Sequence, residues 1–305
     1  MSSLFDLASK VAAGGALAEQ DARQLAATTD LATVGMVAAE ARRVHGGDRV
    51  TFVRVAEFAC GETLPDAGFP TAAGEVRITG TPASIDEAIA TVRACAAAGA
   101  NSAGRVLAGF SLADLWTLAG GNAAALRDFA GELKAAGLSA VADVAVDLEG
   151  RLTWAQIEEA LAIVTAAGLV APVARWETAP ADPVAALKPV RELQAKTRVF
   201  KAFAPLPRTA QAEPPQTGYD GVKLVALARV MLDNVPAIQV DWVRHGPKLA
   251  QVALLFGASD LDRVSPSDDS PLGHRRAPLE EVQRNITAAF LKPLERDGCF
   301  EKVTR

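Results

Sequence analysis

Asp241, Arg244 and His245 stand close together and carry the side chains best suited to proton chemistry in this 305-residue chain. They lie at the end of a short apolar run, and an imidazole beside a carboxylate can move protons near neutral pH. Glu177 follows an earlier apolar run, where it could hydrogen-bond a ligand hydroxyl or cap the next helix. We therefore name Glu177, Asp241 and His245 as catalytic candidates, although an Asp–Arg pair of this kind is commonly structural.

Other polar and aromatic residues also follow apolar runs, and they form a set of candidate ligand-binding residues. Trp176 and Trp242 could stack on a planar ligand, with buried packing as the equal alternative. The full set consists of Gly80, Asp147, Arg175, Trp176, Glu177, Phe203, Arg208, Trp242 and Arg244.

Familiar catalytic and metal-binding motifs are missing from the sequence. It contains no Walker A, GxSxG, HExxH or CxxC pattern. Its three histidines, at 45, 245 and 274, would all have to converge to form a histidine-based metal site. We therefore predict no metal site.

The candidate site residues follow some of eight short apolar runs. After most of these runs comes a stretch with the hydrophobic periodicity of an α-helix. Strands that are almost entirely apolar, each followed by a helix, indicate a parallel sheet covered by helices. Eight such units predict an α/β fold of the closed (β/α)8 TIM-barrel type, in which active sites lie at the carboxyl ends of the strands. The runs are 50–56, 76–80, 104–110, 140–147, 169–175, 199–204, 237–242 and 258–264.

The whole chain, 1–305, is predicted to be one barrel domain with additions at both ends. N-terminal helices occupy 1–46, with helical stretches at about 3–13 and 19–44. The barrel covers 47–264, and a tail with a helix covers 265–305.

Local signals mark several helix ends and one missing helix. Ser84 with Glu87, and Thr153 with Gln156, have the spacing of capping boxes. Glycines at 137 and 168 stand where helices should stop. The segment 56–76 has no helical period, so the connection between the first two strands is predicted to lack its helix.

Composition narrows the classes of function. The net charge of −5 argues against a nucleic-acid partner, which would need a basic surface. No run of eighteen apolar residues exists, and the N-terminus lacks the features of a signal peptide. Cys60, Cys95 and Cys299 are odd in number and far apart, which argues against a disulfide framework. We expect a cytoplasmic protein with reduced thiols and no membrane partner.

Several segments resemble the radical S-adenosylmethionine enzymes of the futalosine menaquinone route, aminofutalosine synthase and dehypoxanthine futalosine cyclase, and the related FO synthase. The strongest is ARVMLDNVPAIQVDWVRHGPKLAQVALLFGASDLD at 228–262. RELQAKTRVFKAFAPLPR at 191–208 and PLERD at 293–297 also match. WET at 176–178 looks like the family's His–Glu–Thr element, with Trp176 in place of histidine. The resemblance implies a radical-SAM-like barrel.

The departures from this family fall on its cofactor-binding elements. Family members present CxxxCxxC after the first strand, three thiolates that hold a [4Fe–4S] cluster and leave one iron for S-adenosylmethionine. Here Cys60 takes the first position, while Leu64 and Ala67 take the other two and offer no lone pair. Gly80 retains only half of a glycine pair, and Asp147 replaces a glutamate. We therefore expect no cofactor and no [4Fe–4S] cluster, and the binding of S-adenosylmethionine is in doubt.

These observations predict a homologue without a cluster, a pseudoenzyme of the futalosine pathway. It would bind a pathway nucleoside, or pair with an active pathway enzyme as a homo- or hetero-oligomer, through flank surface that the missing helix leaves exposed. Two alternatives stay open. One is an iron-independent acid–base enzyme that uses Arg175, Glu177, Asp241 and His245. The other is an aminofutalosine synthase-like activity.

Overall fold

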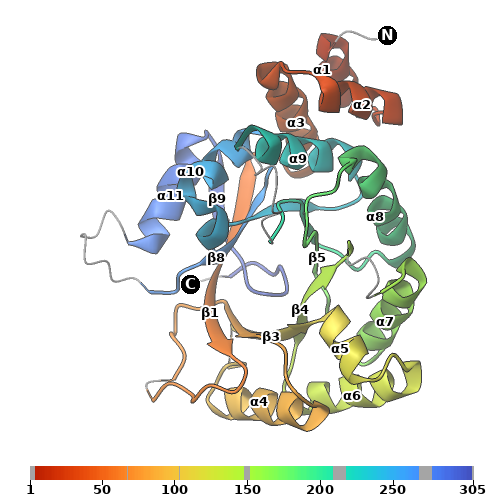
Figure 1. The fold of residues 1–305 in the computed structure, drawn as a ribbon. Helices are drawn as coiled ribbons and strands as arrows, with labels where there is room; N and C mark the ends of the chain where they lie inside the picture. Colours follow the sequence, from red (N-terminus) through yellow and green to blue (C-terminus); the bar gives the residue numbers. More distant parts are fainter. Residues whose placement is uncertain are drawn as a thin grey trace. The chain divides into compact units, whose positions relative to one another are not determined.

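The barrel is closed by parallel strand pairing (Figure 1). Residues 4–66, 68–102, 104–147, 152–208, 218–267 and 277–303 are described by the structure, a computed structural model. The strands follow the order β2-β3-β4-β5-β6-β7-β8-β1-β9, and β1 also pairs with β2, so that β1 to β8 form a ring. The predicted (β/α)8 barrel is therefore confirmed.

The strands are β1 Arg49–Ala59, β2 Glu75–Thr79, β3 Val106–Ser111, β4 Ala140–Ala145, β5 Val173–Arg175, β6 Ala202–Ala204, β7 Ala237–Asp241, β8 Asp260–Val264 and β9 Lys292–Glu295. The helices are α1 Leu4–Ala12, α2 Glu19–Ala27, α3 Leu31–Gly46, α4 Ile85–Ala97, α5 Leu112–Leu118, α6 Ala123–Ala136, α7 Trp154–Ala166, α8 Pro183–Thr197, α9 Gly218–Met231, α10 Trp242–Leu255 and α11 Pro278–Ala288. In the part of the chain that the structure describes, no helix is both long and apolar enough to cross a membrane.

Contacts divide the chain into two compact units. The first unit comprises 1–51, 175–262 and 282–294, and the second comprises 52–174, 263–281 and 295–305. The ends of β5, β6 and β7 belong to the first unit, and those of β2, β3 and β4 to the second.

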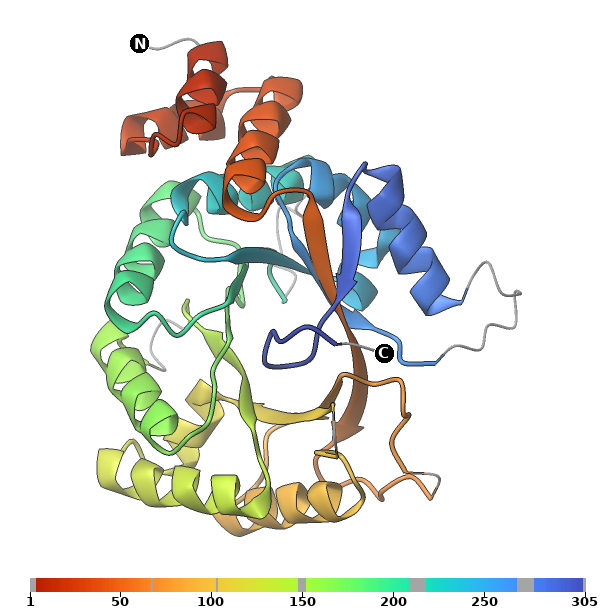
Figure 2. The same ribbon diagram turned by 180° about the vertical axis from the view of Figure 1, so that it is seen from behind.

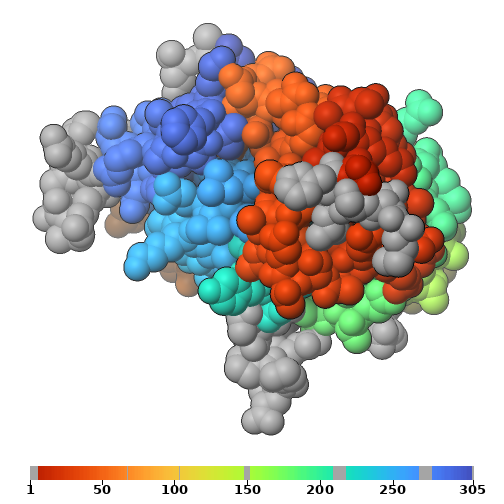
Figure 3. Space-filling model, turned by 90° about the horizontal axis from the view of Figure 1, so that it is seen from above, coloured from red at the N-terminus to blue at the C-terminus, as the bar shows by residue number. Residues whose placement is uncertain are grey.

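The N-terminal region differs from the prediction, because the expected helix at 19–44 is two helices. Thr28 has extended backbone angles (φ −71°, ψ 148°) and ends α2. Asp30 then caps α3, since its Oδ1 accepts a hydrogen bond of 3.1 Å from the Thr33 N–H. In Figure 3 the orange surface of α3 lies next to the light blue surface of α10, and a Cβ on Gly35 would lie 3.5 Å from the Phe256 ring.

Most predicted helix ends are confirmed. Thr153 and Gln156 form a complete capping box, with each side chain accepting from the other residue's N–H. Ser84 accepts from the Glu87 N–H, but the Glu87 carboxylate accepts from Ala83 rather than from Ser84. Gly137 ends α6 with φ 114°, a conformation that glycine adopts most readily.

The strands differ from the apolar runs in length. β5 has three residues where seven were expected, and an isolated bridge from Ala140 to Val170 takes the place of its first half. The C-terminal region, predicted as a tail and a helix, also contributes β9, which pairs with β1. A four-residue segment with a proline has no strand signal of its own, and it becomes a strand only because β1 offers an edge.

The connection between β1 and β2 contains no helix among its described residues, as predicted. Its Phe69 packs edge-to-face on Phe58 at the end of β1, with the ring centroids 6.3 Å apart, and both side chains are buried. None of the described residues of this connection is a large, exposed apolar side chain. The connection therefore covers Phe58, and a partner surface on this flank stays a prediction.

The C-terminal segment after β9 closes the amino-terminal end of the strands in the second unit (Figure 2). Cys299 packs against Val106, Ala108 and Ala140, at the starts of β3 and β4. The segment is held by a part-buried ion pair of 2.9 Å between Arg54 and Glu295. The segment therefore covers the amino-terminal end of these strands, whereas ligands of this fold bind at the carboxyl end.

Gly298 provides a test of this closure. A Cβ at Gly298 would lie 2.9 Å from Glu75 Oε2 and 3.0 Å from Val106 Cβ. We expect Gly298→Ala to lower the free energy of unfolding by about 1–3 kcal/mol through overpacking. Gly131→Ala is the matched control, because a Cβ there meets nothing within 4 Å in the middle of α6. It should raise stability by about 0.4–1 kcal/mol. Denaturant unfolding measures both, and equal stabilities would contradict the close contact.

Candidate functional site

Three connections at the carboxyl ends of β5, β6 and β7 are bonded into one cluster in the first unit. The Arg208 N–H donates to the Glu177 carbonyl at 3.0 Å. The Arg244 guanidinium donates to the Arg208 carbonyl, and the Arg244 N–H donates to Asp241 Oδ1 at 2.9 Å. Four predicted site residues from distant parts of the sequence are therefore linked by a continuous series of hydrogen bonds.

Asp241 places His245 by capping α10. Its carboxylate binds the free N–H of Arg244 in the first turn, which is the usual role of an N-cap aspartate. The helix then breaks at Gly246 (φ 77°, ψ 157°), and Pro247 begins its second part. His245 is thus the last residue of a single turn that is fixed by Asp241 and anchored by the buried Trp242.

His245 is half-buried, and its surroundings favour the neutral imidazole. Burial is the main cause that lowers the pKa of His245 below its usual value. The Asp241 carboxylate opposes this by raising the pKa, while the positive charges of Arg244 and Arg208 lower it. A neutral imidazole near pH 7 can accept a proton, so this residue has the protonation state that a general base requires.

The titration of His245 tests this arrangement. We expect a pKa below the usual value in the native protein, a still lower one in Asp241→Asn, and a higher one in Arg244→Gln. Asn retains the capping ability of Asp, so the helix start should survive. Because the unfolded state binds the proton more readily, the stability contributed by neutral His245 is present above about pH 6.5 and is lost as the pH falls. NMR titration measures the values, with His245→Gln to assign the signal of this residue. An increase in Asp241→Asn would contradict the predicted role of this carboxylate.

Arg175 and Glu177 form an ion pair at the end of β5. Glu177 could instead have capped the next helix, but Asp182 does so, since its Oδ1 accepts from the Ala185 N–H at 3.0 Å. The capping alternative for Glu177 is therefore wrong. The ligand-binding role stays a prediction.

The predicted stacking residues lie in the packed interior of the first unit. Trp176 and Phe203 are 1% and 0% exposed, and their rings meet edge-to-face with the centroids 5.1 Å apart. Trp242 is 6% exposed. Their burial agrees with the packing alternative, and stacking on a ligand stays a prediction.

The remaining predicted residues lie in the second unit. Cys60 follows β1 and Gly80 follows β2, and a Cβ on Gly80 would lie 4.0 Å from the Cys60 Cβ. The Cys60 Sγ lies 3.5 Å from Thr91 Oγ1 of α4. Asp147 is half-exposed two residues after the end of β4. Parallel pairing thus brings Cys60 and Gly80 together.

Comparison with known proteins bears on the C-terminal part of this site. Residues 201–303 match the family described as "CofH/MqnC C-terminal region". The resemblance predicted for this part of the chain is confirmed. Arg208, Asp241, Arg244 and His245 all lie within this CofH/MqnC-like region, whereas Cys60 lies outside it.

Named relatives agree with this result. The 5-amino-6-(D-ribitylamino)uracil–L-tyrosine 4-hydroxyphenyl transferase of Methanothermobacter thermautotrophicus is 35% identical over 130 residues, which cover 37% of this chain and 35% of that protein. The aminodeoxyfutalosine synthase of Streptomyces coelicolor is 31% identical over 137 residues, covering 37% of this chain and 34% of that protein. The chain therefore spans about a third of the length of these curated relatives.

Solved structures support the fold alone. Methylornithine synthase has a TM-score of 0.66 at 14% identity, covering 94% of this chain and 97% of that chain. The FeFe-hydrogenase maturase HydG of Carboxydothermus hydrogenoformans has a TM-score of 0.65 at 14% identity, covering 97% and 80%. Both alignments run over nearly the whole described barrel, beyond the CofH/MqnC-like region.

The residues present do not fit the three-thiolate cluster that the resemblance implies. Leu64 is a half-buried hydrocarbon side chain, and Ala67 lies outside the described residues but has no donor atom by its chemistry. Burial raises the pKa of Cys95 to about 11, and burial likewise raises the pKa of Cys299 to about 11, so both are protonated thiols near neutral pH. Cys299 also lies at the opposite, amino-terminal end of its strands.

The described residues offer no alternative metal-binding group. Among the described residues, no group of three or more His, Cys, Asp or Glu side chains could hold a metal ion. His274 lies outside the described residues, so the predicted absence of a three-histidine site stays a prediction.

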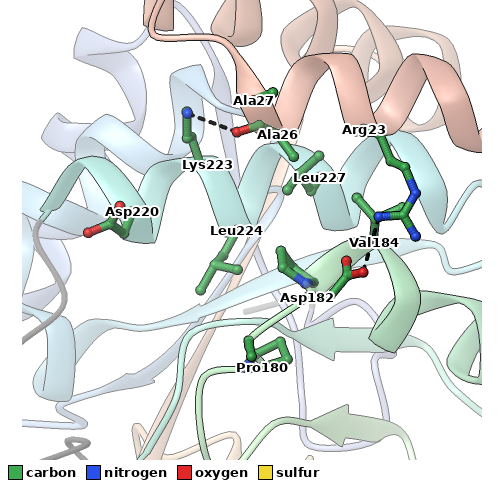
Figure 4. A pocket seen from close by; sticks show the side chains of 12 residues that line it. Arg23, Ala26, Ala27, Pro180, Asp182, Val184, Asp220, Lys223, Leu224 and Leu227 are labelled. Carbon is green, nitrogen blue, oxygen red and sulfur yellow. Dashed lines mark hydrogen bonds and ion pairs between the residues drawn. The ribbon is translucent and has the colours of Figure 1, made fainter. Parts of the chain in front are cut away.

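A cavity that sequence reasoning missed lies in the first unit, between α2, α8 and α9 (Figure 4). Its volume is about 470 Å³. Hydrogen bonds in its walls connect residues far apart in the chain. Arg23 donates to Asp182, 159 residues away, and Lys223 donates to the Ala26 carbonyl, 197 residues away. No sequence pattern could have predicted it, because each helix contributes only a few lining side chains.

Proposed function

We propose that this protein is a homologue of the futalosine-route and FO-synthase-type enzymes that lacks the iron–sulfur cluster and binds a pathway nucleoside. Binding would take place at the carboxyl ends of β5, β6 and β7. The observation that carries the proposal is a contrast. Two of the three positions that would bind the iron–sulfur cluster are Leu64 and Ala67, while the polar residues of the CofH/MqnC-like region are linked to one another by hydrogen bonds. A related version of the proposal is that the protein pairs with an active pathway enzyme.

The charged side chains at the carboxyl ends of β5, β6 and β7 suit a polar ligand with hydroxyl groups. Arg208 and Arg244 supply donors, and the carboxylates of Glu177 and Asp241 supply acceptors, which together match the donor and acceptor pattern of a sugar. Because Glu177 is part of an ion pair with Arg175, its orientation is set before a ligand arrives. Such preorganisation reduces the entropy lost on binding.

An acid–base enzyme is the second candidate. The neutral state of His245, with Asp241 beside it, supports this alternative, because a base at the open end of a barrel can take a proton from a bound substrate. Glu177 would be the second titratable group of such a site.

Calorimetric titration of aminofutalosine, dehypoxanthine futalosine and S-adenosylmethionine tests the binding function. We expect one nucleoside to bind with micromolar affinity and to be recovered unchanged by chromatography. Glu177→Gln should weaken binding about tenfold, the effect of one charge-assisted hydrogen bond. Lys248→Gln, an exposed substitution in the second part of α10, is the control and should bind like the parent. No binding of either nucleoside would contradict the proposal. Conversion that disappears in His245→Gln would favour the acid–base enzyme.

Anaerobic reconstitution with iron and sulfide tests the loss of the cluster. The parent protein should remain colourless, because one thiolate cannot hold the cluster. The double variant Leu64→Cys/Ala67→Cys restores the three positions and should turn brown if the connection still has the required shape. A brown parent protein would show that other ligands complete the site, and the proposal would then be wrong.

A further inference from the structure

The cavity between α2, α8 and α9 contains none of the predicted site residues, and its size is typical of ligand pockets. Its volume of about 470 Å³ falls within the range of roughly 300–1,000 Å³ for small-molecule sites. It shares one segment with the candidate site, because the connection after β5 places Glu177 in the hydrogen-bonded cluster and Asp182 in the wall of the cavity.

The middle of the cavity is apolar. Val184 of α8 and Leu224 and Leu227 of α9 form its packed floor, each at most 5% exposed. Ala27 and Pro183 supply more exposed apolar atoms along its walls. Figure 4 shows Leu224 and Leu227 between the two charged ends. A hydrocarbon chain or ring placed here would exchange water for aliphatic contacts.

At the Arg23 end of the cavity, two carboxylates already balance the positive charge. The guanidinium of Arg23 bonds to Glu19 at 3.0 Å and to Asp182 at 3.1 Å. Asp182 is itself engaged in capping α8. Both groups therefore hold the helices together instead of facing a ligand.

The Lys223 end is different. Within the described part of the chain, the ammonium group has one hydrogen bond, of 3.1 Å, to the Ala26 carbonyl near the end of α2. An ammonium group has three donors, so two remain for a ligand. Asp220, one turn earlier on α9, is the carboxylate that lines this end, and it disfavours ligands with more than one negative charge.

We propose that this cavity is an accessory site for a small amphipathic monocarboxylate. The apolar body of the ligand lies against Ala27 and Pro183, over the packed floor formed by Leu224 and Leu227, and its carboxylate accepts hydrogen bonds from Lys223. Such a ligand bridges α2 and α9 and stabilises the folded protein by mass action. The site is independent of the proposed nucleoside function.

Octanoate is the probe, with 1-octanol and octylamine as matched compounds that lack the carboxylate. Protein-observed NMR titration should show octanoate binding with shifts confined to α2, α8 and α9, and clearly weaker binding of the other two compounds. Lys223→Gln should weaken octanoate about tenfold and leave 1-octanol unchanged, because only the charge-assisted bonds are lost. Lys248→Gln is the control, with unchanged affinity.

A second variant fills the cavity without removing the ammonium group. Ala27→Phe places a ring in the space and should abolish the binding of octanoate, while the melting temperature without ligand stays close to that of the parent. Octanoate binding that survives both Lys223→Gln and Ala27→Phe would overturn the proposal, as would the absence of any shift in α2, α8 and α9. Neither outcome would affect the nucleoside titrations.

Discussion

A buried carboxylate at the start of β8 holds the barrel strands of the first unit in place. Asp260 is fully buried, and it accepts hydrogen bonds from Thr51 of β1 at 2.5 Å and from Gln239 of β7 at 2.8 Å. A buried carboxylate without such partners would strongly destabilise the fold. The three strands β1, β7 and β8 must therefore align so that Thr51 and Gln239 can donate to Asp260. Thr51 and Gln239, both neutral donors, thus stabilise Asp260 where β8 meets β1 in the ring of strands.

That register decides where the candidate site lies. With Gln239 fixed opposite Asp260, β7 ends at Asp241, whose carboxylate starts α10 and places Arg244 and His245. The position of Arg244 and His245 thus depends on the alignment of β7 with β8 and on the capping of α10 by Asp241. In the second unit, the C-terminal segment covers the amino-terminal ends of the strands.

The two candidate regions differ in their chemistry. The CofH/MqnC-like region carries polar, hydrogen-bonded residues at its strand ends, while Leu64 and Ala67 place hydrocarbon side chains in the connection after β1. The backbone around it still has the expected form, since Cys60 and Gly80 remain neighbours through the pairing of β1 with β2. A protein can keep the fold of such an enzyme without its metal chemistry, because the fold depends on core packing and the chemistry on a few donor atoms.

The sequence by itself determined the barrel, the family resemblance and most helix ends, because apolar periodicity and capping residues act locally. It also determined that Leu64 and Ala67 cannot bind iron, which follows from side-chain chemistry alone. Tertiary structure decided the rest. The burial of Trp176 against Phe203, the strand β9 and the capping of α8 by Asp182 all depend on partners distant in the chain. The cavity beside Lys223 is the extreme case, because it exists only where three helices meet and no single helix carries a signal for it.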